Sequence, residues 1–374
     1  MNKLLFAIYF SICFQFSASA AANFKLEQAP DYSILKSYKG SELCQLATNT
    51  LNYLNNNKED SYAVHGGSIN GQPIDIEKVK ATLTFICQTY REDVRAGRQS
   101  RLHNNEFLNQ HVNFYRWYPD KTTATKVASK STNQVKTRML NNIPSDKLFL
   151  TKYYTKLIKG SPVKTVEYNQ ALYQLPNDEI GLSLAQAEQK KDKLTRYKFT
   201  RQQVLEGTIE KNALAKPLVW ITEQALHDVL LQGTAVLEID GKTRYFNVHR
   251  NNGISYDYHI GKTEQARYWY FAEVPNVMGY GKEITEKIPL YSQISLAGNV
   301  KQLGLGKLFL ISFDSSSFNQ SRLAILADEG GAFDNNLFQL DLLVDSYWGW
   351  TDYHQANKHI PDYASVWMLL LKDK

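Results

Sequence analysis

The stretch TAVLEIDGKTRYFNV, residues 234–248, indicates the fold class more clearly than any other part of the chain. Two runs rich in branched and aromatic residues flank Asp240-Gly241, and this dipeptide supplies the positive φ that a tight hairpin turn needs. Runs of similar character occupy residues 148–158, 308–313, 322–327 and 364–371. We therefore expect a large β portion from about residue 148 to the end.

The first third of the chain predicts helices. Residues 41–56 and 76–96 carry apolar residues at helical spacing, and asparagines and glycines between them mark a connection. Cys44 and Cys87 fall in these two segments. Export would permit a disulfide between them, and two buried thiols are an equally good interpretation. Short helices are also expected at 182–191 and 222–231. The fold class is thus α+β, mainly β with N-terminal helices.

The N-terminus is typical of a secretory signal peptide. Lys3 precedes a short apolar run, and Ala18 and Ala20 then place cleavage after residue 20. Cys13 follows Ile12, where a lipoprotein signal needs a small residue, so we expect no lipid anchor. No later segment is apolar enough to be a transmembrane helix. The expected location is the periplasm or cell envelope.

The charge balance favours an anionic polymer as partner over nucleic acid. Lysine and arginine number 43 against 37 acidic residues, and basic side chains cluster at 121–145 and 190–201. A solvated surface is the simpler interpretation of both clusters. No nucleic-acid-binding motif is present. Asp352, His354 and His359 have the spacing of no standard metal site, so no metal is predicted.

Further motifs follow one another in a fixed order over well more than half of the chain. They are LFLTKYY (148–154), YNQALYQLP (168–176), FTRQQVLEG (199–207), PLVWI with the hairpin (217–248), NNGISYDYHIG (251–261), and LADEGGAF, DSYWG and VWMLLL (326–333, 345–349 and 366–371). Each motif alone is a weak signal. Their common order resembles the membrane-bound lytic murein transglycosylase A family.

The resemblance implies two domains with a groove between them. Residues 1–20 would be the signal peptide, 21–147 a helical segment with the start of a barrel, 148–261 an inserted β-rich domain, and 262–374 a C-terminal double-psi β-barrel (3D) domain. It also implies a lyase that cleaves the β-1,4 bond between N-acetylmuramic acid and N-acetylglucosamine of peptidoglycan without water. The product would carry a 1,6-anhydro ring, and no cofactor would be required.

One carboxyl group is enough for such a reaction, whereas ordinary glycosidases use two. The group protonates the leaving oxygen and then takes the proton of the sugar's own C6 hydroxyl, so the acid and base roles are sequential. It must begin protonated near neutral pH. Burial or a neighbouring carboxylate would raise its pKa enough for that.

The resemblance places this catalytic group at Asp345, in DSYWG. Asp341 is the alternative, and Asp328, in LADEGGAF, would be a supporting acid. Capping of turns between barrel strands is the structural interpretation of all three aspartates. Gly330 and Gly331 would let the backbone approach a sugar or make a tight turn. The other substrate-binding candidates, for which simple packing is the alternative, are Tyr153, Tyr154, Gln232, Gly233 and Trp348.

Departures from the family pattern leave two other functions open. The glutamate of the family's "GYYEP" is absent from residues 152–156, and the first barrel aspartate is replaced at Ala297 or Gly298. A catalytically weak or inactive peptidoglycan-binding or scaffolding protein is therefore the main alternative. A hydrolase on the same barrel, which would release reducing ends, is a third hypothesis.

Overall fold

The computed structural model describes residues 23–30, 39–315, 318–330, 333 and 335–373. The predicted signal peptide at 1–20, together with Cys13 and Gly331, lies outside the described residues. Within the described ranges, none of the helices has the length and apolar character needed to cross a bilayer.

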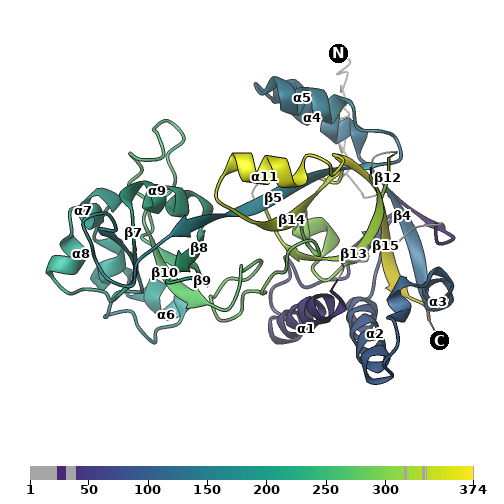
Figure 1. Cartoon of the computed structure of the whole chain (residues 1–374), viewed down its shortest axis with the longest axis horizontal. Coiled ribbons are helices and arrows are strands. Elements are labelled where there is room, and N and C mark those ends of the chain that lie inside the picture. Colours follow the sequence, from purple (N-terminus) through teal and green to yellow (C-terminus); the bar gives the residue numbers. More distant parts are fainter. Residues whose placement is uncertain (1–22, 31–38, 316–317, 331–332, 334, 374) are drawn as a thin grey trace, which may run out of the picture.

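One half of the molecule is a closed β-barrel (Figure 1). The strands follow one another around the ring, and pairing of the last with the first closes it. β11 pairs with β13 and β14 with β5 in parallel, whereas the other neighbours are antiparallel. This confirms the predicted fold class with its double-psi barrel. The ring order is β15 (Tyr363–Leu371), β12 (Leu308–Ser315), β13 (Phe318–Asp328), β11 (Ser295–Ala297), β14 (Gln339–Tyr347) and β5 (Leu148–Lys159).

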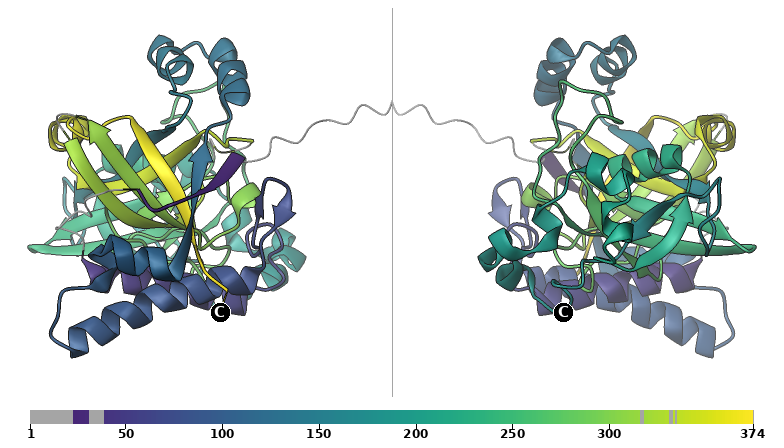
Figure 2. Two further views of the ribbon diagram at one scale, coloured as in Figure 1. Left: turned by 90° about the vertical axis from the view of Figure 1, so that its right-hand side faces the viewer. Right: turned by 90° about the vertical axis from the view of Figure 1, so that its left-hand side faces the viewer.

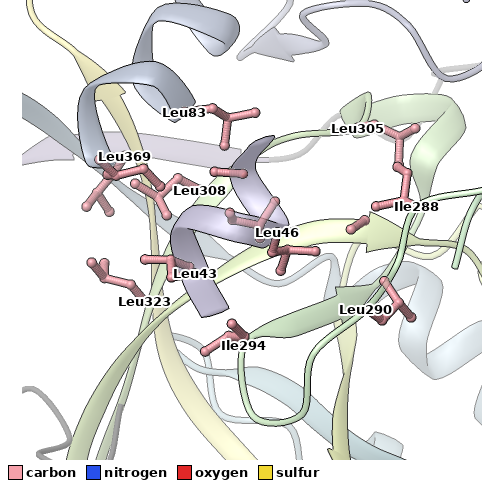
Figure 3. Packing of buried hydrophobic residues seen from close by; sticks show 14 of the residues in the cluster. Leu43, Leu46, Leu83, Ile288, Leu290, Ile294, Leu305, Leu308, Leu323 and Leu369 are labelled. Carbon is pink, nitrogen blue, oxygen red and sulfur yellow. The ribbon is translucent and has the colours of Figure 1, made fainter. Parts of the chain in front are cut away.

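Strand β15 shows why these sequences are almost continuously apolar. Alternate side chains of a strand face opposite sides. Val366 and Met368 belong to one buried cluster inside the barrel, and Trp367 and Leu369 belong to a second cluster beneath two helices. Those helices are α1 (Gly40–Asn56) and α2 (Ile76–Arg95), whose Leu43, Leu46 and Leu83 pack on the strands (Figure 3). Both faces of β15 are therefore removed from water.

Smaller elements extend the barrel. β4 (Val112–Tyr118) pairs with β15, and β1 (Asn23–Glu27) pairs with β4. The hairpin of α4 (Lys121–Lys130) and α5 (Gln134–Asn141) stands on the side of the barrel opposite α1 and α2 (Figure 2). The remaining elements of this half are β2 (Ser68–Ile69), β3 (Gln72–Pro73), α3 (Asn105–His111), α10 (Val300–Leu303), α11 (Trp350–Asn357) and a 3-10 turn at Arg101–His103.

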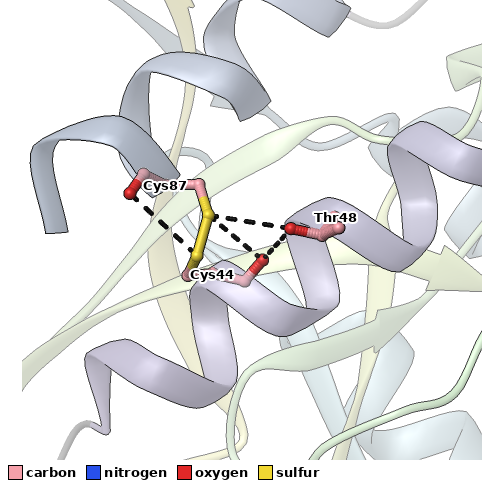
Figure 4. The surroundings of a disulfide bond; sticks show 3 residues. All are labelled: Cys44, Thr48 and Cys87. Carbon is pink, nitrogen blue, oxygen red and sulfur yellow. Dashed lines mark hydrogen bonds between the residues drawn. A yellow bond between two sulfur atoms is a disulfide. The ribbon is translucent and has the colours of Figure 1, made fainter. Parts of the chain in front are cut away.

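A disulfide joins α1 to α2. Cys44 and Cys87 are bonded across the helix pair with their Cα atoms 4.5 Å apart, and both side chains are buried (Figure 4). Thr48 donates a hydrogen bond of 2.8 Å to the Cys44 carbonyl one turn further along α1. The bridge therefore fixes the two helices that cover one side of the barrel.

We expect Cys44→Ser/Cys87→Ser to lower the free energy of unfolding by about 2–4 kcal/mol, because the bridge closes a loop of 43 residues in the unfolded chain. Urea titration of the oxidised protein, the reduced protein and the double variant measures this change in the free energy of unfolding. Reduced protein and double variant should unfold at similar urea concentrations. Equal midpoints for oxidised and reduced protein would contradict the expectation.

The second lobe grows out of strand β5, whose end pairs with β8 (Thr234–Ile239) through Leu157–Lys159. β9 (Lys242–Asn251) and β10 (Trp269–Val274) continue this sheet. The predicted hairpin at 234–248 is confirmed, since Asp240 and Gly241 have φ values of 50° and 73°. The hydrophobic core of the lobe runs from Ile158 to Phe271. It begins ten residues after the expected start of the domain at 148 and ends ten residues after its expected end at 261.

The rest of the second lobe is helical, with one small sheet. The helices expected at 182–191 and 222–231 are present, and Thr222 accepts the backbone N–H of Ala225 as an N-cap. The elements are β6 (Gln170–Tyr173), β7 (Pro217–Ile221), α6 (Leu184–Gln189), α7 (Arg201–Leu205), α8 (Thr208–Lys211), α9 (Glu223–Gln232) and 3-10 turns at Lys191–Lys193 and Thr195–Tyr197.

A buried ion cluster holds this lobe together. Glu179 has no exposed side-chain surface and accepts hydrogen bonds from Arg196 at 2.8 Å and Arg250 at 2.9 Å. Arg250 also binds Glu283, at 3.1 Å, in the connection that returns to the barrel. The cluster therefore ties the helical part of the lobe to β9 and to that connection.

Candidate active site

A pocket of about 520 Å³ lies where the two lobes meet. The barrel contributes the ends of β13 and β11, the first part of β14 and the middle of β5, and the second lobe faces them with the end of α9 and with β9 and β10. The barrel side is lined by Tyr153, Tyr154, Ala297, Asp328, Glu329, Gly330 and Asp341, and the opposite side by Gln232, Gly233, Thr234, Asn247, Val248, Asn251 and Trp269. The chain between the lobes adds Val277, Met278, Gly279 and Lys287.

Two carboxyl groups share the barrel wall because of the strand order. β11 runs between β13 and β14, and Ala297 pairs with Asp328 on one side and with Asp341 on the other. Asp328 accepts the backbone N–H of Glu329 at 2.9 Å and the hydroxyl of Tyr153 at 3.1 Å. The small side chain of Ala297 leaves the space between the two carboxyl groups open to the pocket.

Asp341 keeps one carboxyl oxygen without a partner. Its Oδ1 is buried and makes no hydrogen bond to any part of the chain that the structure describes. A buried polar atom in this state costs free energy unless a ligand or water satisfies it. Since the group lines an open pocket, a bound molecule is the natural partner.

Burial raises the pKa of both groups. It raises the pKa of Asp328 to about 6. Burial and the negative charge of Asp328 together raise the pKa of Asp341 to about 7. The positive charge of Lys287 acts in the other direction on the pKa of Asp328, and so does the Tyr153 hydroxyl. Near neutral pH, Asp341 therefore carries a proton in a substantial part of the molecules, while Asp328 is mostly ionised.

Asp345, the preferred catalytic residue of the sequence analysis, has a different setting. It is exposed, it does not line the pocket, and its Oδ1 accepts the backbone N–H of Ser346 at 2.8 Å. In a regular strand, residues four apart face the same side. Here the register shifts between Leu343 and Asp345, so that Val344 is an extra residue in β14. The bulge reverses the alternation and turns Asp345 away from Asp341.

The other predicted site residues also divide into those that line the pocket and one that does not. Tyr153, Tyr154, Gln232, Gly233 and Gly330 all line the pocket. Trp348 is outside it and partly exposed. The Tyr154 ring stacks on Tyr353 with centroids 4.6 Å apart, so part of its surface is already covered.

Besides Gln232 and Gly233, the second lobe contributes residues to the site that the sequence did not single out. Gly233 ends α9 with φ of 82°, and a Cβ there would lie 3.2 Å from the Trp269 ring. The Arg267 guanidinium lies 4.3 Å from the centre of that ring. Asn247 is buried, donates to Thr234 at 2.9 Å, and has an Oδ1 without a partner among the described residues. Asn247 Oδ1 is thus a second open acceptor in the pocket.

The sequence offers different amounts of information about Trp269, Asn247 and Lys287. The aromatic run RYWYF at 267–271 could have marked Trp269. Asn247 is one of several polar residues of β9, so the sequence does not set it apart. Nothing near Lys287 in the sequence points to the pocket. Across the described residues, no three His, Cys, Asp or Glu side chains come together as metal ligands would.

Comparison with known proteins agrees with this architecture. A family model described as the MltA specific insert domain matches residues 149–267. Escherichia coli MltA with bound chitohexaose is 14% identical, with 94% of this chain and 95% of that chain covered and a TM-score of 0.51. A membrane-bound lytic murein transglycosylase from Agrobacterium tumefaciens is 14% identical, with coverage of 91% and 96% and a TM-score of 0.53.

MltA from Neisseria gonorrhoeae is 12% identical, with coverage of 94% and 91% and a TM-score of 0.57. No curated protein sequence matches the chain. At such identities the structural likeness defines the fold, which is that of the MltA lytic transglycosylases. The second lobe corresponds to the stretch matched by the insert-domain model, and the resemblance carried by the motif order is confirmed at the level of the fold.

Proposed function

We propose that the protein is a peptidoglycan lytic transglycosylase whose catalytic residue is Asp341. The observation that carries this proposal is the carboxyl group of Asp341, which lines the pocket between the lobes with one buried oxygen that has no partner among the described residues. Burial and Asp328 raise its pKa to about 7, as a group that gives and takes a proton near neutral pH needs. A similar fold has been solved with chitohexaose bound, which is a glycan. The proposed site of action is the cell envelope, where peptidoglycan lies.

In the proposed reaction, Asp341 gives its proton to the glycosidic oxygen as the bond to C1 breaks. The carboxylate then takes the proton of the C6 hydroxyl, whose oxygen attacks C1 and closes the 1,6-anhydro ring. No water enters the products, and Asp341 ends the cycle protonated. Ionised Asp328, oriented by Tyr153 at 3.1 Å, would stabilise the positive charge that develops at C1.

The second lobe would hold the sugar. The free Oδ1 of Asn247 can accept the N–H of an acetamido group, and Gln232 lies on the same wall. Trp269 offers an aromatic surface of the kind that packs against the apolar face of a sugar ring. Sugar contacts from one lobe and the acid from the other would place the scissile bond at the junction.

Digestion of purified sacculi, followed by mass spectrometry of the soluble products, tests the proposal. Muropeptides with 1,6-anhydro ends are the expected result. Products with reducing ends would identify a hydrolase instead. Binding of the protein to sacculi without release of soluble muropeptides would favour the second candidate function, that of a glycan-binding scaffold protein. The missing first barrel aspartate supports that candidate, because the family pattern has this acid where the chain has Ala297 or Gly298, and Ala297 pairs with both Asp328 and Asp341.

The pH dependence of cleavage should follow the two raised pKa values. We expect kcat/KM to be highest between about pH 6 and 7, since Asp328 must be ionised and Asp341 protonated. Activity falls above pH 7 as Asp341 loses its proton. Asp328→Asn removes a negative charge that holds this proton, so its residual activity should decline at lower pH than that of the wild type. A decline at unchanged or higher pH would contradict the assignment.

A further inference from the structure

A second cleft, of about 670 Å³, lies next to the active-site pocket. It lies between helix α1 and the chain that follows β10. Met278 and Lys287 line both hollows, so the two are neighbours on either side of these residues. A molecule held in the pocket could therefore extend a branch into this cleft, which we name the α1 cleft.

One wall of the α1 cleft consists mostly of carboxamides. Asn49, Asn52 and Asn56 are spaced three or four residues apart along α1 and so share one face of the helix. Asn57 donates to the Tyr53 carbonyl at 3.2 Å. Asn52 and Asn56 are exposed and make no side-chain hydrogen bond to another described residue. The wall consists of Asn49, Asn52, Tyr53 and Asn56 of α1 and of Asn57, which caps the C-terminal end of that helix.

The opposite wall carries charges of both signs. Glu273 and Glu286 are exposed acids, and Lys287 is a cation at the junction with the active-site pocket. The lining contains a single aromatic residue, Tyr53, which is buried. The cleft therefore lacks the exposed ring on which a sugar packs.

The wall around Tyr53 is held in place from behind. Asp60 is buried and accepts hydrogen bonds from the hydroxyls of Tyr53 at 2.8 Å and Tyr280 at 3.0 Å, and from Lys282 at 3.1 Å. These contacts hold α1 against the chain that forms the other wall. A ligand would thus enter a preformed cleft, which lowers the ordering cost of binding.

We propose that the α1 cleft binds the peptide that branches from the glycan while the sugar occupies the active-site pocket. Carboxamides offer one donor and one acceptor side by side, as the peptide group does. Lys287 would meet a peptide carboxylate, and Glu286 an ammonium group, because Glu273 is already paired with Arg244 at 2.6 Å. The proposal rests on the proposed function, because it takes peptidoglycan as the substrate.

Binding measurements with the uncleaving Asp341→Asn protein test the proposal. The probes are a peptide-free tetrasaccharide of alternating N-acetylglucosamine and N-acetylmuramic acid and the same tetrasaccharide with its peptides. Calorimetry should show about tenfold tighter binding of the peptide-bearing form, and Asn52→Ala/Asn56→Ala should remove most of this difference, because two amide contacts of about 1 kcal/mol each are lost. Affinity for the peptide-free form should not change.

Asn55→Ala is the matched control. Asn55 is an exposed asparagine of the same helix and lines a different hollow, so its loss should leave both affinities as they are. Equal affinity of the parent protein for the two probes would overturn the proposal. So would a double variant that loses affinity for both probes equally, since the cleft would then hold sugar.

Cleavage is scored separately, on sacculi digested by the protein with an intact Asp341. Peptide-dependent affinity without release of anhydro products would support peptide binding in the α1 cleft and refute the lytic reaction. Release of anhydro products with no peptide-dependent affinity would refute only the cleft. If neither probe binds and no anhydro products are released, both proposals fail.

Discussion

Asp341→Asn should lower kcat for glycan cleavage by about 10³-fold or more, whereas Asp345→Asn should leave it within about twofold. Loss of a general acid–base group typically costs 10²–10⁴-fold, and here one group would serve both steps. An asparagine keeps the size of the side chain but cannot transfer the proton. Release of soluble muropeptides from labelled sacculi measures both variants.

The two substitutions form a matched pair, because they make the same chemical change four residues apart on one strand. Affinity for chitohexaose should persist in Asp341→Asn, which separates a loss of catalysis from a loss of binding. An inactive Asp345→Asn beside an active Asp341→Asn would reverse the assignment. Loss of activity in neither variant would remove both aspartates from the mechanism.

The largest expected loss of stability is in the second lobe. Glu179→Ala should lower its free energy of unfolding by about 3–5 kcal/mol, because it leaves Arg196 and Arg250 buried without their shared counter-charge. Thermal and urea unfolding, followed by tryptophan fluorescence, measure the change.

Glu188→Ala is the control for this prediction. Glu188 also approaches Arg196, at 3.8 Å, but about half of its side chain is exposed. Ion pairs in water contribute little, so the control should change stability by less than about 1 kcal/mol. Equal effects of the two substitutions would show that burial of Glu179 is unimportant.

Much of the fold was predictable because its signals are local. The Asp240-Gly241 turn, the helical spacing before residue 96 and the motif order each depend on neighbouring residues. Family resemblance then indicated the pocket side chains Tyr153, Gln232 and Asp328, which the structure brings together.

The choice between Asp341 and Asp345 could not be made in this way. It depends on the bulge at Val344, and a bulge leaves no mark in a run of apolar residues such as LDLLVD. The raised pKa of Asp341 likewise comes from burial and from Asp328, a neighbour two strands away. Lys287 and Asn247 reach the pocket only through tertiary packing.

Strand β5 has a mechanical consequence for the groove. It is hydrogen-bonded to β14 and β15 in the barrel and, at Leu157–Lys159, to β8 in the second lobe. A strand paired at both ends offers no free pivot, so the walls can approach or separate only as far as β5 bends or twists. The distance between Asp341 and the opposite wall of the pocket thus depends on how far this continuous strand bends or twists. A fragment that contains the second lobe and begins at residue 160 would lack Leu157–Lys159, with which β8 pairs. The edge of β8 would then be open to pairing with other chains and prone to aggregation.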